Sequence, residues 1–127
     1  MPHTADVALR VWGETVSDLF LQAGIGLGEV LKAQPDENAP VTRSALTLHE
    51  ADHESLLVAF LSELLFYLER DGILFAPETL VVEGTRLSAD LAGRPVVAGR
   101  EIKAVTYSNL EIVRTGGRYE ATLVFDL

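Results

Sequence analysis

The sequence predicts an α+β fold, built as two layers, with two main helices packed on a mainly antiparallel β-sheet. Two long stretches repeat apolar residues with a helical period, and the remaining segments alternate apolar and polar residues between turn signals. The chain has 127 residues, of which 48% are hydrophobic and 23% are charged. We therefore expect a single domain over residues 1–127 with a substantial core.

The first half begins with a strand and a helix. The segment from Val7 to Trp12 alternates apolar and polar side chains, which is typical of a strand with one buried face. Thr15 stands three residues before Asp18, at the spacing of a capping box, and predicts a helix that continues to about Lys32. This first helix is followed by a short connection.

Three glycines at positions 24, 26 and 28 lie inside that helix. Each glycine weakens a helix by roughly 0.5 to 1 kcal/mol relative to alanine, so we expect close packing on the sheet as their reason. Their spacing resembles that of a phosphate-binding loop. No strand directly precedes them and no Lys-Ser or Lys-Thr follows, so that interpretation is rejected.

The central part predicts a second strand and a long helix. Thr42–His49 alternates like the first strand, and Asp52 is placed to cap a helix that runs through about Arg70 and ends at Asp71-Gly72. The apolar stripe of this helix is broad. We expect it to be the central packing helix of the domain.

From Ile73 the pattern changes to period two, with turn residues at 84–85, 93–95 and 116–117. These features predict antiparallel strands. A two-residue turn at 116–117 would place Thr115 opposite Arg118 and, further along, Tyr107 opposite Asp126. Asp126 then points away from the core, as Asp6 does on the first strand.

An oxygen-rich group of residues marks the end of the sequence. Asp126 precedes Leu127, so a side-chain carboxylate stands beside the terminal carboxylate of the chain as given. If this strand end lies near Asp6, three oxygen-bearing groups converge. The sequence has no cysteine, and such a group of oxygens suits a hard cation such as calcium.

Charge and hydropathy restrict the classes of partner. The net charge is −9 and the bases form no cluster, so direct nucleic-acid binding is not expected. The longest apolar stretch, Leu56–Leu68, is shorter than the roughly 20 residues that span a bilayer. The first residues lack a secretory signal, and we expect no membrane association and a cytoplasmic location.

Four segments together resemble the archease family. They are His3–Val7 near the start, Leu64–Leu68 in the long helix, Glu101–Tyr107 in the second half and Val124–Leu127 at the end. Their order and spacing also match, and the resemblance covers nearly the whole chain. It implies an archease-like fold.

The resemblance also implies a function. Archeases are non-catalytic partners of the RtcB-type RNA ligase, which seals tRNA exon halves or broken RNA ends with GTP and manganese that belong to the ligase. They promote transfer of GMP to the ligase's own histidine and allow repeated turnover in tRNA splicing or RNA repair. They bind calcium at positions that correspond here to Asp6, Asp126 and Leu127, the last through backbone oxygens.

Three further residues are weaker candidates for contact with the partner or with the metal ligands. His3 belongs to the His-Thr-Ala-Asp segment, Lys103 lies among apolar residues, and Glu63 interrupts the apolar run of the long helix. The family's histidine after Thr-Tyr is replaced here by Ser108, which does not titrate near neutral pH.

Two alternatives stay open at the level of sequence. Asp6, Asp126 and Glu63 are carboxylates of the kind that a metal-dependent hydrolase uses. Against this, the sequence lacks a cysteine nucleophile, a Gly-x-Ser-x-Gly elbow and paired histidines. A general chaperone or adaptor would need a sizeable exposed apolar surface. We expect an activator of a partner enzyme that is not itself an enzyme.

Overall fold

The computed structural model describes residues 6–107 and 109–127. Its elements in chain order are β1 (Asp6–Gly13), α1 (Val16–Val30), β2 (Ala33–Pro35), β3 (Thr42–His49), α2 (His53–Asp71), β4 (Ile73–Glu83), β5 (Arg86–Ala98), β6 (Ala104–Val105), β7 (Val113–Thr115) and β8 (Arg118–Asp126). The α+β class is confirmed. No helix in the described ranges is long and apolar enough to cross a membrane.

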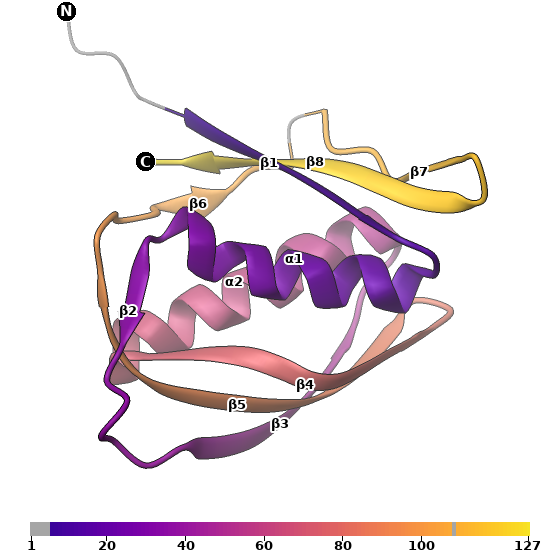
Figure 1. Cartoon of the computed structure of the whole chain (residues 1–127). Coiled ribbons are helices and arrows are strands. Elements are labelled where there is room, and N and C mark those ends of the chain that lie inside the picture. Colours follow the sequence, from indigo (N-terminus) through magenta and orange to yellow (C-terminus); the bar gives the residue numbers. More distant parts are fainter. Residues whose placement is uncertain (1–5, 108) are drawn as a thin grey trace, which may run out of the picture.

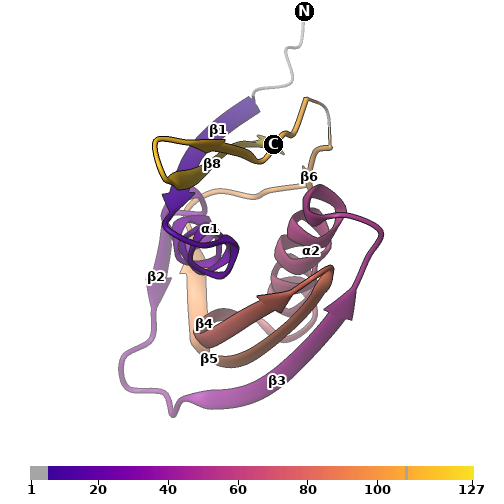
Figure 2. The ribbon, with the colours of Figure 1, turned by 90° about the vertical axis from the view of Figure 1, so that its right-hand side faces the viewer.

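The strands form two antiparallel sheets, and the helices lie between them (Figures 1 and 2). In the first sheet β8 is central, with β1 on one side and β6 and β7 on the other. In the second sheet β5 is central and pairs with β2, β3 and β4. The sequence pattern predicts helices on a sheet, and the structure adds that the strands divide between two sheets that enclose them.

Both helices begin at the residues that their N-caps predict, and α2 also ends as predicted, whereas α1 ends at Val30, shortly before the expected Lys32. Thr15 Oγ1 accepts a hydrogen bond of 3.0 Å from the Asp18 N–H, and Asp52 Oδ1 accepts one of 2.7 Å from the Ser55 N–H. Gly72 ends α2 in the left-handed conformation, with φ of 71°. These local interactions satisfy backbone groups that the helices leave free, and they need no tertiary partner.

The glycines of α1 allow the helix to approach both sheets. A Cβ atom at Gly24 would lie 2.9 Å from Cδ of Pro77, on β4 of the second sheet. One at Gly26 would lie 2.6 Å from Cδ2 of Leu9, on β1 of the first sheet. Positions two apart point to nearly opposite sides of a helix. Close packing, the expected reason for these glycines, is therefore confirmed on two sides at once.

One expected turn is wrong. Residues 84–85 and 116–117 form the turns that the sequence predicts, but Gly93, Arg94 and Pro95 lie inside β5, which continues to Ala98. Gly93 does not have a positive φ. A residue with a side chain would not fit at this position, because its Cβ would lie 2.5 Å from the carbonyl oxygen of Leu74 on the neighbouring strand. The glycine thus reflects a close approach of two backbones.

The β7–β8 hairpin has the predicted register and is shorter than predicted. Thr115 pairs with Arg118, and the ladder ends after Val113. The next residue toward the N-terminus, Ile112, donates its N–H to Oε2 of Glu54 on α2 at 3.0 Å. A helix side chain therefore holds the backbone at the point where the ladder ends.

The core is shared by the helices and both sheets. Its large, fully buried side chains come from α1, α2, β5 and β8 and include Phe20, Phe60, Leu87, Leu91 and Phe125. No polar or charged residue of the described chain is buried. Ionisable groups therefore act at the surface.

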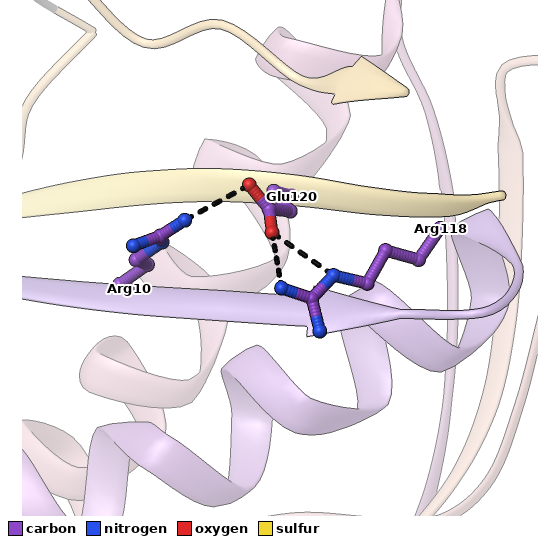
Figure 3. A network of polar contacts seen from close by, with 3 residues as sticks. All are labelled: Arg10, Arg118 and Glu120. Atoms are coloured by element: carbon purple, nitrogen blue, oxygen red, sulfur yellow. Dashed lines mark hydrogen bonds and ion pairs between the residues drawn. The ribbon is translucent and has the colours of Figure 1, made fainter. Parts of the chain in front are cut away.

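The outer face of the first sheet carries a three-residue ion network (Figure 3). Glu120, whose side chain is 14% exposed, accepts hydrogen bonds from Nη2 of Arg10 at 3.1 Å and from Nε of Arg118 at 3.0 Å. The Arg118 guanidinium also lies 5.3 Å from the centre of the Trp12 ring. The hydrogen bond from Arg10, and then that from Arg118, holds the pKa of the Glu120 carboxyl below its usual value.

We expect the Glu120→Gln variant to be less stable than the native chain near neutral pH and to lose that difference in acid. Because the pKa of Glu120 is lowered in the folded state, its contribution is present above its unfolded pKa of about 4.3 and disappears as the pH falls through the folded value. Thermal unfolding followed from about pH 7 to about pH 2.5 measures the difference. Glu50→Gln serves as control, and a pH-independent gap would contradict the assignment.

Two glycines on the side of α1 that faces β4 should respond differently to an added methyl group. Gly24→Ala should lower the free energy of unfolding by about 1 to 3 kcal/mol, because the Pro77 ring has little freedom to move away. Gly28→Ala meets only an ordinary contact, 3.4 Å from Cδ2 of Leu74, and should raise it by up to about 1 kcal/mol through helix propensity. Urea unfolding of both variants tests this, and equal effects would contradict the packing described.

Candidate metal site at the end of the first sheet

Two carboxylates meet where β1 begins and β8 ends. Asp6 and Asp126 are direct partners in the antiparallel pairing of these strands. Residues paired in this way point to the same face, with Cβ atoms about 4.5 to 5.5 Å apart. On the other side of β8, Ala104 of β6 is the partner of Asp126. The expected pairing of Tyr107 with Asp126 is therefore wrong, because β6 joins the sheet three residues earlier.

The end of β8 is held in place by the chain before β6. The Lys103 N–H donates a hydrogen bond of 2.8 Å to the backbone carbonyl oxygen of Asp126. That oxygen is therefore already used within the chain. Asp126 is half-buried and Asp6 is exposed, while Leu127 packs partly against the core. The oxygens left for a ligand are the side chains of the two aspartates and the backbone of Leu127.

No base neutralises this pair within the described residues. No Lys, Arg or His nitrogen there lies within 4.0 Å of either carboxylate. Arg10 lies on the same face of β1, but its guanidinium is bound to Glu120. Like charges directly opposite each other on a sheet are destabilising, and a bound cation removes that cost.

The available donors fit a hard cation in type and charge. Carboxylate and backbone oxygens are the ligands that calcium prefers, and it takes about six to eight of them. Across residues 6–107 and 109–127 there is no cluster of three or more His, Asp or Glu side chains that would surround a metal. The oxygens of the described residues could therefore supply only part of the coordination shell of such a cation.

The weaker sequence candidates do not join this pair as side chains. Lys103 is exposed and contributes only its backbone, while Glu63 is half-buried on α2. In the described structure no Cα atom of α2 lies within 8 Å of one in β1 or β8. Burial, and then the nearby Glu63 carboxylate, raises the pKa of Tyr67. His3 and Ser108 lie outside the described residues.

Two features escaped the sequence analysis. One is the ion network of Glu120, for which the only local signal is the spacing of Arg118 and Glu120 on one face of a strand. The other is a groove of about 740 Å³ between α2 and residues 98–105, which runs from the half-exposed Phe66 to Lys103 beside the aspartate pair. Its walls are distant in sequence, so no local pattern marks it.

Comparison with known proteins gives a consistent answer. The model of the Archease protein family matches residues 1–127. Protein archease of Methanopyrus kandleri is 33% identical, with 98% of this chain and 95% of that protein covered. Protein archease of Methanosarcina mazei is also 33% identical, with 100% and 93% covered.

Comparison with solved structures points to the same family as the comparison of sequences. The crystal structure of an archease from Thermotoga maritima, described as a possible chaperone, matches with a TM-score of 0.74 at 26% identity, and the match covers 100% of this chain and 94% of that one. That protein therefore has a fold similar to the one that Figure 1 shows for this chain. From its whole-length match to the family and its similarity to the two archaeal relatives, this chain belongs to the archease family.

Proposed function

We propose that this archease is a non-catalytic activator of an RtcB-type RNA ligase, in tRNA splicing or RNA repair. In this role it promotes guanylylation of the ligase and allows repeated turnover, in the cytoplasm. Family membership supports the proposal. The single structural observation that carries it is the pair Asp6 and Asp126, opposed at a sheet end with no base beside it among the described residues.

We further propose that this pair holds a calcium-type cation together with the backbone oxygens of Leu127. The aspartates supply two negative charges, and coordination positions beyond the chain's own oxygens are left for water or for the ligase. When bound, the cation supplies positive charge that oxygen groups of a partner can coordinate. GTP and manganese belong to the ligase, and with a net charge of −9 this chain is not expected to hold RNA itself.

The geometry supports a metal-dependent hydrolase less well than an activator. It needs Glu63 near Asp6 and Asp126, whereas Glu63 lies on α2, which does not approach β1 or β8 within the described chain. General chaperone activity requires a large apolar surface, but the exposed apolar side chains are spread over both sheets and both helices, as Trp12, Ile25, Phe66 and Val97 illustrate.

A substoichiometric amount of this protein should accelerate covalent GMP loading of its cognate ligase. We expect Asp126→Ala to slow that loading roughly tenfold or more relative to the native chain, because it removes one of two carboxylates from the site. Asp90→Ala is the matched control, since Asp90 is an exposed strand residue on the second sheet. No acceleration of an active ligase by the native chain would overturn the activator proposal.

Calcium should stabilise the native chain and not the Asp126→Ala variant. At a free calcium concentration of about 100 times Kd, the expected gain in unfolding free energy is about 2.7 kcal/mol. In a chelator, Asp126→Asn should unfold at a higher temperature than the native chain, because it removes repulsion between opposed carboxylates. Equal calcium responses in the native chain and in Asp126→Ala would contradict the metal proposal and leave the activator test unaffected.

A further inference from the structure

Strand β1 has a free edge. It pairs with β8 from Asp6 to Gly13 on one side only, and no other described segment forms a backbone hydrogen bond with it. The strand is eight residues long and contains no proline. An edge of this kind presents unpaired N–H and C=O groups, which can pair with another extended chain.

A groove of about 480 Å³ runs beside this edge, between β1 and α1. One wall is the strand from Leu9 to Gly13, and the other includes four residues of α1 at helical spacing: Asp18, Gln22, Ile25 and Glu29. Figure 1 shows β1 crossing over α1 on this side of the molecule. At about 3.4 Å per residue, the strand wall accommodates an extended segment of about five residues.

The groove is negatively charged and partly apolar. Glu14, Asp18 and Glu29 are exposed, and none forms an ion pair with a described base. Arg10 is the one base that lines the groove in the described structure, and Glu120 already binds it. Ile25 is 46% exposed and adds an apolar contact on the helix wall.

We propose that this groove binds an extended basic segment of a partner protein, which adds to β1 as a new edge strand. The segment's backbone pairs with the free edge of β1. Because side chains alternate along a strand, every second one faces α1, where a lysine or arginine reaches Asp18 or Glu29 and an aliphatic residue contacts Ile25. The inference needs neither the metal nor the ligase of the proposed function.

Charge distinguishes this occupant from a second copy of the chain. Pairing of two β1 edges would bring the carboxylates Glu14, Asp18 and Glu29 of both copies together, and each copy has a net charge of −9. Like charges across an interface oppose association, whereas a basic segment gains from the same groups. The edge and its charge therefore favour a basic partner segment.

The test uses a fluorescent peptide of about ten residues in which every second residue, on the face that meets α1, is in turn lysine and valine, with threonine at the positions between them. A second peptide has the same sequence with every backbone amide N-methylated, which keeps the charge and removes strand pairing. Fluorescence anisotropy with the full chain should show binding that weakens with salt, and the N-methylated peptide should bind at least about tenfold more weakly. Absence of binding, or equal binding of both peptides, would overturn the proposal.

Charge reversal tests the groove itself. The double variant Glu14→Lys/Glu29→Lys should weaken peptide binding roughly tenfold, whereas the matched variant Glu37→Lys/Glu50→Lys, away from the groove, should change it less than about twofold. Glu29 lies in the last turn of α1, where lysine suits the helix dipole, so folding should be retained. Equal weakening in both variants would show that the peptide is attracted only by the net charge of the chain, and it would contradict the proposed site in the groove.

Amide hydrogen exchange then locates the peptide. Bound peptide should protect amides of β1 and leave those of β3, an edge strand of the second sheet, unchanged. Protection at β3 in place of β1 would overturn the proposal. So would a dimer that protects β1 without peptide, because the occupant would then be a second copy of the chain.

Discussion

The pairing of the first strand with the last is the interaction on which the rest of this structure depends. β1 and β8 pair along the whole of β1, so residues from opposite ends of the sequence become neighbours. The inner face of that pair, with Val11, Leu123 and Phe125, covers the helices, and the outer face carries the ionisable groups. The same register sets Asp6 against Asp126 and leaves the other edge of β1 free.

Helix α1 transmits this arrangement to the second sheet. Gly24 and Gly26 let it lie close to both sheets, at a cost in helix propensity that packing on two sides offsets. Because α1 is held between the sheets, its exposed stripe stays beside the free edge of β1. The groove for a basic segment and the end that carries the aspartates are thus two products of one arrangement of strands over a helix.

The distribution of charge on the first sheet has a simple physical cause. Arg10 and Arg118 both bind Glu120, so the bases of this face are used at one end of it. The carboxylates of Asp6 and Asp126 at the other end, and those beside α1, have no such partner in the described structure. Negative charge without a base attracts cations, and this attraction is the common basis of the metal ion proposed at the sheet end and of the basic segment proposed along the edge.

The sequence by itself determined the local parts of this protein. Thr15, Asp52 and Gly72 mark helix ends because their interactions lie within a few residues. Thr42–His49 is a strand within the bounds that its alternation predicts, and the outward direction of Asp6 and Asp126 follows from the period of two. Both aspartates of the candidate site were therefore recognisable before the fold was known.

Only the tertiary structure decided which strands are neighbours. The division into two sheets, the passage of β5 through Gly93–Pro95 and the pairing of Ala104 with Asp126 depend on contacts between distant residues. The groove beside β1 also joins a strand and a helix whose proximity no local pattern encodes. Capping and periodicity act over one turn or one pleat, whereas sheet order is set by how the two apolar sides of the helices are covered.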